Sequence, residues 1–231
     1  IEAHSIDIGF GRTVTDVTPS DNNDSFVVRS ESSGEAMSDS FAKAVIIANG
    51  CYDHPNMLGV EGENLSHVSH YYTEPHEFYR KDVVIVGGKN SAAEAALDLF
   101  RTGANVTLVH RGRELGGSIK YWVRPDLENR IKEGSIAARF EATVKEIRAQ
   151  EVIVECQGKE SAVPADAVFL LTGYLADLTF LRRCGVEVSE SNIPHHDPKT
   201  FESNVRGLYL AGAVVAGANR GEVFIENGRF H

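Results

Sequence analysis

Two short apolar runs flank an alanine-rich segment near the middle of the chain. The first, at residues 83–86, is continuous and β-branched, which is typical of a parallel strand buried on both faces. Gly87–Gly88 follow at once, and apolar residues at helical spacing then extend to Gly103. The second apolar run occupies residues 106–109. This pattern predicts a strand, a tight turn, a helix and a second strand, which together form the βαβ unit of a parallel sheet.

The predicted helix carries signals at both ends. Ser91 and Glu94 have capping-box spacing. We therefore expect the serine hydroxyl to accept a hydrogen bond from the Glu94 amide, while the Glu94 carboxylate accepts one from the Ser91 amide. Gly103 lies where a left-handed C-cap would end the helix.

The turn before the helix matches two of the three defining positions of the dinucleotide fingerprint G-x-G-x-x-G/A, and a lysine replaces the middle glycine. A helix N-terminus behind such a turn favours an anion, because its free amides and its dipole both attract negative charge. The context predicts a pyrophosphate site, although an ordinary glycine-rich turn is the alternative. The residues expected to bind the pyrophosphate are Gly87, Gly88, Lys89, Asn90, Ser91 and Ala92.

The end of the second strand indicates which nucleotide binds. An acidic residue there suits the ribose hydroxyl of NAD, whereas basic residues suit the 2′-phosphate of NADP. The residues present are His110, Arg111 and Arg113, with Lys120 further on. Because a guanidinium group donates two parallel hydrogen bonds to phosphate, they favour NADPH over NADH. The alternative is that they are solvated charges on a loop.

The flanking segments predict further strands. Residues 1–50 read as a β-meander whose third strand is residues 44–48, and residues 51–80 read as a linker. The four histidines of this linker lack partners at metal-ligand spacing, so no metal site is expected. Tyr71 and Tyr72 are expected to pack at a domain junction.

Beyond the βαβ unit, a helix is expected from Arg124, with Pro125 at its first turn, to Gly134. The remaining expected elements are strands at residues 142–147, 151–156, 167–171 and 207–215, and the start of a helix at residues 222–227.

Composition excludes several classes of function. The 231 residues are 42% hydrophobic, which is enough for the core of one or two domains. A formal net charge of −10 argues against nucleic-acid binding and against anionic membranes. No apolar run is long enough to span a bilayer. The three cysteines are widely spaced without a C-x-x-C pair, so we expect a reducing compartment, the cytoplasm.

Several stretches together resemble one known family. In chain order they are AVIIANG, VVIVGGKNSAAEAALDLFRTGANVTLVHRG, SIKYWVRPDLENRIKEG, LLTGY, GLYLAG and FIENGRFH. They resemble the thioredoxin-reductase-like flavoproteins, which are NADPH oxidoreductases with two dinucleotide-binding domains. Within that group the chain is most similar to the bacillithiol-disulfide reductase family. The GGKNSA turn, the SIKYW loop and the IENGRFH tail are the specific parts of the resemblance.

The resemblance implies an α/β fold in which a Rossmann-like NADPH domain is inserted in a partial FAD domain. Residues 1–78 and 176–231 are then expected to belong to the FAD domain, and residues 79–175 to the NADPH domain. AVIIANG and GLYLAG would approach the flavin. The residues implied to bind FAD are Asn49, Gly50, Gly212, Ala213 and Glu222, and Gly173 joins the residues implied to bind NADPH.

The chain departs from the family in three respects. Ala213 stands where the wider superfamily has an aspartate that binds the flavin, so that contact is absent. The family also opens with a βαβ unit carrying G-x-G-x-x-G and ends with a further helix, so we expect these residues to be an interior piece that binds FAD poorly alone. Cys51 follows AVIIANG and is interpreted as a structural or incidental thiol, so no catalytic residue is assigned.

The function implied by the resemblance is the NADPH-dependent, FAD-mediated reduction of a small-molecule disulfide such as bacillithiol disulfide, by an enzyme that is expected to be a homodimer. One alternative is a ferredoxin- or flavodoxin-NADP reductase of the same fold, which uses a protein electron partner. Another is a nucleotide-binding fragment without catalysis. A thioredoxin reductase is disfavoured because that enzyme carries a C-x-x-C pair in its NADPH domain.

Overall fold

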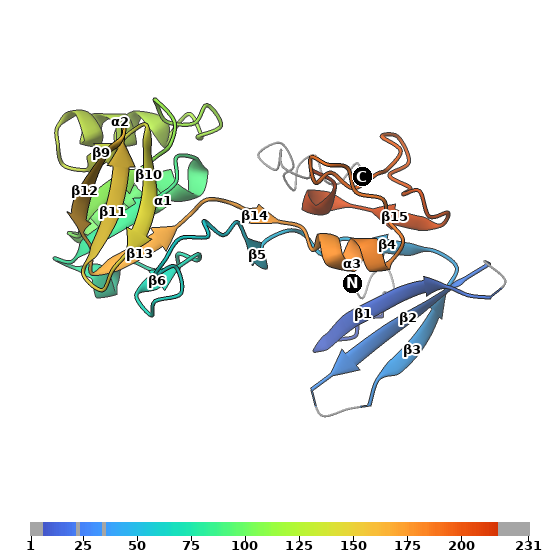
Figure 1. The fold of residues 1–231 in the computed structure, drawn as a ribbon. Coiled ribbons are helices and arrows are strands. Elements are labelled where there is room, and N and C mark those ends of the chain that lie inside the picture. Colours follow the sequence, from blue (N-terminus) through green and yellow to red (C-terminus); the bar gives the residue numbers. More distant parts are fainter. Residues whose placement is uncertain (1–6, 22–23, 34–35, 217–231) are drawn as a thin grey trace. The chain divides into compact units, whose positions relative to one another are not determined.

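The computed structural model describes residues 7–21, 24–33 and 36–216 and divides the chain into two compact units (Figure 1). One unit joins residues 1–54 to residues 174–231, and the other consists of residues 55–173. An inserted unit therefore interrupts a discontinuous one. The linker expected at residues 51–80 lies mostly inside the inserted unit, since that unit begins at residue 55 rather than at residue 79.

A five-stranded sheet forms the centre of the inserted unit, in the order β6-β13-β7-β8-β9. All neighbouring pairs in this sheet are parallel. The central strands β7 and β8 are the two predicted from the apolar runs, and β13 is the strand expected from residue 167. The bounds are β6 (Val68–Ser69), β13 (Ala167–Leu170), β7 (Asp82–Val86), β8 (Asn105–Val109) and β9 (Ala137–Arg139).

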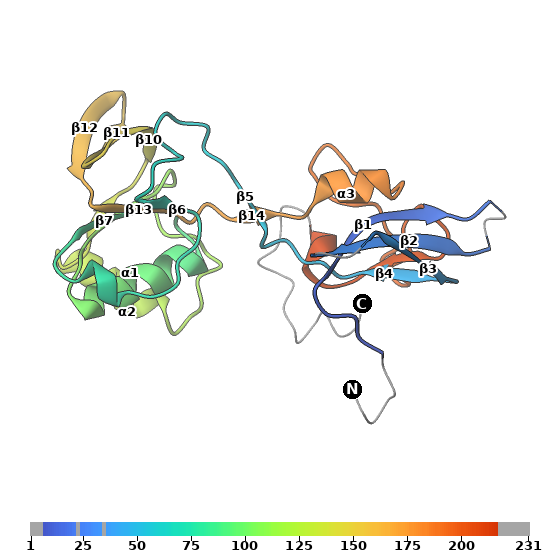
Figure 2. The ribbon, with the colours of Figure 1, turned by 90° about the horizontal axis from the view of Figure 1, so that it is seen from below.

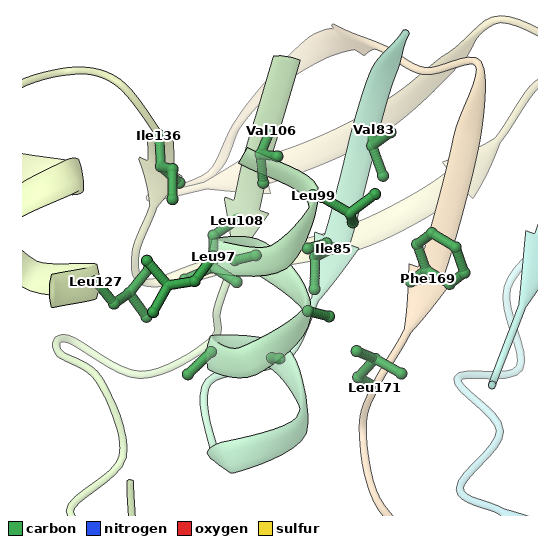
Figure 3. Close-up of a cluster of buried hydrophobic side chains, with 14 of the residues drawn as sticks. Val83, Ile85, Leu97, Leu99, Val106, Leu108, Leu127, Ile136, Phe169 and Leu171 are labelled. Atoms are coloured by element: carbon green, nitrogen blue, oxygen red, sulfur yellow. The ribbon is translucent and has the colours of Figure 1, made fainter. Parts of the chain in front are cut away.

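Both faces of this sheet are covered, as the continuous run in β7 predicted. Val83 and Ile85 pack beneath α1 (Asn90–Thr102) and α2 (Arg124–Lys132), where Leu97, Leu99 and Leu127 meet the sheet (Figure 3). The alternate residues of β7, Val84 and Val86, face a second cluster. Figure 2 shows an antiparallel sheet on that side, formed by β10 (Ala142–Ile147), β11 (Glu151–Cys156) and β12 (Lys159–Pro164).

The ends of the helices confirm one predicted signal and contradict another. Gly103 is the C-cap of α1 with φ 93°, and α2 begins at Arg124 with proline in its first turn, as expected. The capping box is wrong. The N-cap of α1 is Lys89 without a side-chain hydrogen bond, and the Glu94 carboxylate accepts a hydrogen bond from Lys120 Nζ at 2.8 Å instead.

Residues 55–78 pack on the core of the inserted unit. Tyr72 packs against the α1 side of the core and donates a hydrogen bond from its hydroxyl to Asp98 Oδ2 at 2.6 Å. Its ring meets Phe169 edge-on, with centroids 5.4 Å apart. Tyr72 is therefore half-buried against the core of this unit, and the expectation that it packs at a domain junction is wrong. The same segment holds the 3-10 helix η2 (His76–Phe78).

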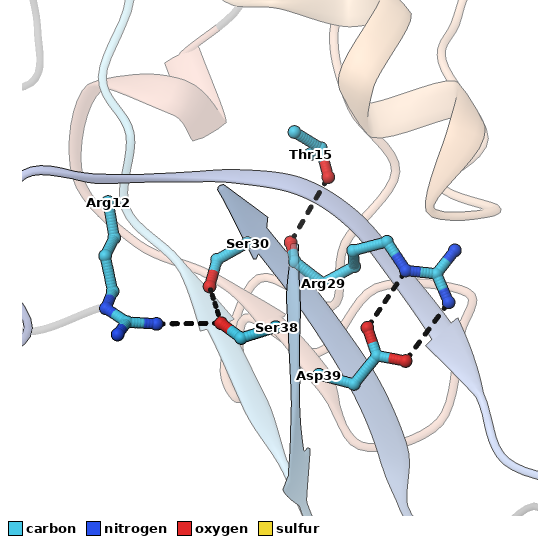
Figure 4. Close-up of polar contacts among 6 residues, drawn as sticks. All are labelled: Arg12, Thr15, Arg29, Ser30, Ser38 and Asp39. Atoms are coloured by element: carbon cyan, nitrogen blue, oxygen red, sulfur yellow. Dashed lines mark hydrogen bonds and ion pairs between the residues drawn. The ribbon is translucent and has the colours of Figure 1, made fainter. Parts of the chain in front are cut away.

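The discontinuous unit contains an antiparallel sheet of β1 (Arg12–Pro19), β2 (Phe26–Ser32) and β3 (Ser38–Ala42). The third strand of the meander is thus β3 and not residues 44–48. β3 was not predicted from the sequence because its residues are mostly polar. It pairs with β2, where Arg29 lies opposite Asp39 and donates to both carboxylate oxygens at 2.9 and 3.2 Å (Figure 4).

Residues expected to complete the meander pair elsewhere. β4 (Val45–Ile47) lies parallel to β15 (Leu208–Leu210), with Ile47 opposite Leu210. After β15 the chain forms the 3-10 helix η3 (Gly212–Ala216), so the strand expected at residues 207–215 is shorter. α3 (Leu178–Arg183) packs on the same core. β5 (His54–Pro55) pairs with β14 (Tyr174–Leu175), and the helix expected at residues 222–227 lies outside the described residues.

Among the described residues, no helix combines the length and the apolar character needed to cross a bilayer.

Candidate functional site

The turn between β7 and α1 leaves no room for side chains. The Gly87 amide donates to the Val109 carbonyl at 3.0 Å, which holds the turn against the neighbouring strand. A Cβ atom at Gly87 would lie 2.6 Å from the Leu171 carbonyl oxygen and 2.9 Å from the Ala92 Cβ atom. Only glycine fits here, so the turn has the close backbone packing that a dinucleotide-binding site requires.

Gly88 lies directly against the side chain of the residue that follows β8. A Cβ atom at Gly88 would overlap the imidazole ring of His110, and one at Gly112 would lie 2.7 Å from the same ring at Nε2. The ring therefore lies between two glycine backbones. Burial, with the nearby charge of Arg111, lowers the pKa of His110 below its ordinary value of 6.5. The packing between two glycine backbones and the lowered pKa of His110 both favour the uncharged form of the ring.

The N-terminus of α1 offers free amide groups behind this turn. The Ala93 amide donates to the Lys89 carbonyl at 3.0 Å, and the amides of residues 90–92 precede it and have no acceptor within the helix. The side chains of Lys89 and Ser91 are exposed, and the Ala92 side chain is buried against Gly87. The arrangement suits an anion bound by main-chain donors.

Residues 116–120 form a second wall of this site, which the sequence reasoning missed except for Lys120. The Gly116 amide donates to the Gly88 carbonyl at 2.8 Å. The Asn90 side chain donates to the Ser118 carbonyl at 2.9 Å and accepts from the Lys120 amide at 2.8 Å. The adjacent glycines at residues 116 and 117 were the one sequence signal of a close approach.

The three predicted phosphate-binding cations differ in their surroundings. Arg113 Nε donates to Glu141 Oε1 at 3.1 Å, and Lys120 Nζ donates to Glu94 Oε1 at 2.8 Å. Arg111 is exposed and has no acidic partner within the described part of the chain. Exposed ion pairs contribute little free energy, so a phosphate can displace either carboxylate. Arg111 is available without any such exchange.

Gly173 lies beyond the end of β13, which runs beside the turn. The Leu171 amide donates to the Val86 carbonyl at 2.8 Å, and Gly173 has φ 95°. Its carbonyl accepts from the Asn56 amide at 2.9 Å, and the Thr172 hydroxyl donates to the Asn56 carbonyl at 2.7 Å. Gly173 therefore belongs to a loop at the carboxyl edge of the same sheet, and hydrogen bonds to Asn56 hold this loop in place.

The residues implied to bind FAD follow two paired strands of the discontinuous unit. Asn49 and Gly50 follow β4, and Gly212 and Ala213 follow β15. Because these strands are parallel neighbours and the Ala211 amide donates to the Ile47 carbonyl at 3.0 Å, the four residues lie at one strand edge. Gly50 and Gly212 have φ 69° and 75°, and a Cβ atom added at either would meet no atom of the described residues within 4 Å. Glu222 lies outside the described residues.

A small pocket adjoins this strand edge in the discontinuous unit. His54 Nε2 lies 3.6 Å from Asp177 Oδ2, which marks one side of it. Within the described ranges, no three histidine, cysteine or acidic side chains are grouped to hold a metal ion. The lining residues are Asn49, Gly50, Cys51, Asp53, His54 and Asp177.

Comparison with known proteins gives the family. Residues 1–212 match the family described as pyridine nucleotide-disulphide oxidoreductase. Over 211 residues the chain is 44% identical to the bacilliredoxin reductase Bdr of Bacillus subtilis (strain 168), covering 90% of this chain and 64% of that protein. It matches the solved bacillithiol disulfide reductase Bdr from Bacillus cereus at 37% identity with a TM-score of 0.96, covering 100% of this chain and 71% of the other.

A more distant relative is the ferredoxin–NADP reductase of Ignicoccus hospitalis, 28% identical over 185 residues, which cover 77% of this chain and 58% of that protein. The chain thus spans about two thirds of the length of these relatives. The matches to Bdr confirm the resemblance to the bacillithiol-disulfide reductases that the motifs indicated. With its parallel sheet, glycine turn and inserted unit, the chain belongs to the pyridine nucleotide-disulphide oxidoreductase family.

Proposed function

We propose that this chain is part of an NADPH-dependent FAD oxidoreductase that reduces the disulfide of a low-molecular-weight thiol, with bacillithiol disulfide as the substrate. The observation that carries the proposal is the likeness, over the whole chain, to a solved bacillithiol disulfide reductase. When bound, NADPH and FAD supply the hydride donor and the electron carrier that this reaction requires. The protein supplies their binding and orientation.

The inserted unit has the groups that NADPH needs. The amides of residues 90–92 would hold the pyrophosphate, and Gly87 allows the close packing of turn, strand and helix behind them. Arg111 would hold the 2′-phosphate, because its guanidinium group is exposed and unengaged by any acidic residue of the described chain. Arg113 and Lys120 would add charge after leaving their carboxylates.

The discontinuous unit would hold part of FAD. The strand edge formed after β4 and β15 carries two glycines, which lack the side chains that would keep a flavin away from the backbone. As part of the same proposal, the enzyme works in the cytoplasm as a homodimer.

A ferredoxin–NADP reductase is the second candidate. The relatives of that name, 26–32% identical to this chain, favour it. The cysteines of this chain do not distinguish the two candidate functions, because the three of them include no C-x-x-C pair.

The test is turnover by the purified protein that contains this chain. A flavin absorption spectrum and oxidation of NADPH with bacillithiol disulfide, faster than with NADH, support the proposal. Turnover with reduced or oxidised ferredoxin and none with the disulfide supports the second candidate. A colourless protein that oxidises no NADPH overturns both.

A further inference from the structure

The Asn90 side chain joins the start of α1 to a segment far along the chain. Its Nδ2 atom donates to the Ser118 carbonyl, 28 residues away, and its Oδ1 atom accepts from the Lys120 amide, 30 residues away. A carboxamide can donate and accept at the same time, whereas a carboxylate has no donor and an apolar side chain has neither group. Both polar atoms of Asn90 are thus engaged with the main chain of residues 116–120.

Two further contacts hold the same segment. The Gly116 amide donates to the Gly88 carbonyl at 2.8 Å, and Lys120 Nζ donates to Glu94 Oε1 at 2.8 Å. A Cβ atom at Gly116 would lie 2.8 Å from the Gly88 carbonyl oxygen, so this approach requires glycine. The segment is therefore fixed at both ends, on the turn at one and on the first part of α1 at the other.

The fixed segment positions groups suited to an adenine dinucleotide. Lys120 is followed by the exposed aromatic residues Tyr121 and Trp122, and its Nζ atom lies 5.7 Å from the centroid of the Trp122 ring. This stretch thus carries two exposed aromatic rings and a lysine that can pair with phosphate. Its position relative to α1 depends on Asn90.

We propose that Asn90 is a positioning residue for NADPH, which acts through residues 116–120 and not through contact of its side chain with the nucleotide. This inference rests on the proposed function, because it takes the nucleotide site at α1 as given. Without the carboxamide, the segment loses two hydrogen bonds and must be ordered by the nucleotide itself. Ordering at the moment of binding weakens affinity.

The experiment measures NADP⁺ binding by calorimetry in the full protein and its variants Asn90→Ala, Gly116→Ala and the double variant. Each single change releases the segment from a different side, and Asn90→Ala leaves the main-chain amides of α1 in place. We expect each single variant to bind NADP⁺ about tenfold more weakly, because each loses hydrogen bonds whose combined contribution corresponds to about that factor in affinity. The double variant should also bind NADP⁺ only about tenfold more weakly than the unaltered protein, because both changes remove the same effect, the ordering of residues 116–120 before the nucleotide binds.

Amide hydrogen exchange without nucleotide is a second measurement, which would not change if Asn90 acted only by contacting the nucleotide. The Lys120 amide should exchange faster in Asn90→Ala without nucleotide, whereas Asn129→Ala, an exposed asparagine on α2, should change neither exchange nor binding. Effects of Asn90→Ala and Gly116→Ala that add in the double variant overturn the inference, as does unchanged exchange at Lys120. Unchanged NADP⁺ binding in Asn90→Ala also overturns it, with the proposed function intact. Failure of the unaltered protein to bind NADP⁺ overturns both.

Discussion

The imidazole ring of His110 occupies the space into which any side chain at Gly88 would project. Gly88 occupies the variable position directly after the first glycine of the dinucleotide fingerprint, and His110 directly follows β8, the second strand of the βαβ unit. Two residues that the sequence analysis expected at separate parts of the nucleotide, the pyrophosphate and the 2′-phosphate, therefore form one packed pair in this protein. The small size of residue 88 is required by the protein before any ligand binds.

This packing predicts the effect of Gly88→Ala. The added methyl group must displace the imidazole ring, and overpacking of this kind costs about 1–3 kcal/mol of unfolding free energy. His110→Ala in the same chain should recover much of that loss, because it vacates the space. Urea unfolding of the two single variants and the double variant measures the coupling.

The matched control is Gly117→Ala, where nothing lies within 4 Å of an added Cβ atom. It should change the unfolding free energy by about 0.5 kcal/mol or less. Strictly additive effects of Gly88→Ala and His110→Ala would contradict the packed pair.

The same pair predicts how stability depends on pH. The pKa of His110 is lowered by burial and by Arg111, so the unfolded chain binds a proton at a pH where the folded protein does not. Stability is therefore greatest above the ordinary pKa of about 6.5 and falls as the pH drops through it. The His110→Asn variant should show a shallower decline in urea midpoint from about pH 7 to about pH 5.

His76→Asn serves as the control for that series. The His76 side chain lies in the same unit and is 81% exposed, so its replacement should leave the decline of the urea midpoint unchanged. A decline that is equally steep in unaltered protein and His110→Asn would show that another group titrates.

Local sequence predicted the central βαβ unit because its signals are local. The run in β7 has apolar residues at every position, and the structure uses Val83 and Ile85 on one face and Val84 and Val86 on the other. Gly103 likewise ends α1 by its own conformation, with φ 93°. Strand, helix and cap all depend on neighbours within a few residues.

The predictions that were wrong depended on partners distant in the chain. Glu94 has the spacing of a capping box, but its carboxylate pairs with Lys120, 26 residues further on. Tyr72 was assigned to a junction because nothing local shows that its hydroxyl reaches Asp98. The polar strand β3 is specified largely by its pairing with β2, including Arg29 with Asp39. Local sequence patterns do not reveal such pairings, because the partners come together only in the folded chain.

Arg111 should determine the preference for NADPH. Replacing it by glutamate puts a negative charge where the 2′-phosphate would bind and takes away the guanidinium group that would donate two charge-assisted hydrogen bonds to it. We expect the ratio of NADP⁺ to NAD⁺ affinity to fall by about 10- to 100-fold, with little change for NAD⁺ itself. Calorimetric titration with both nucleotides measures the ratio.

Arg139→Glu is the control for charge alone, because Arg139 is exposed at the end of β9 in the same unit. It should shift the affinity ratio far less than Arg111→Glu. An unchanged ratio in Arg111→Glu would refute the assignment of the 2′-phosphate to this residue.

Cys184 should be the least reactive thiol of the chain. It is 3% exposed in the core of the discontinuous unit, and burial raises its thiol pKa to about 11. Since the thiolate is the nucleophile, its reactive fraction near pH 8 is about a hundredfold below that of an ordinary thiol. In a timed iodoacetamide reaction with peptide mass spectrometry, Cys184 should be labelled only on addition of urea, well after the half-buried Cys156. Equal labelling rates for Cys184 and Cys156 in the folded protein would contradict the burial of Cys184, whereas a Cys184→Ser variant that unfolds at lower urea would support its packing role.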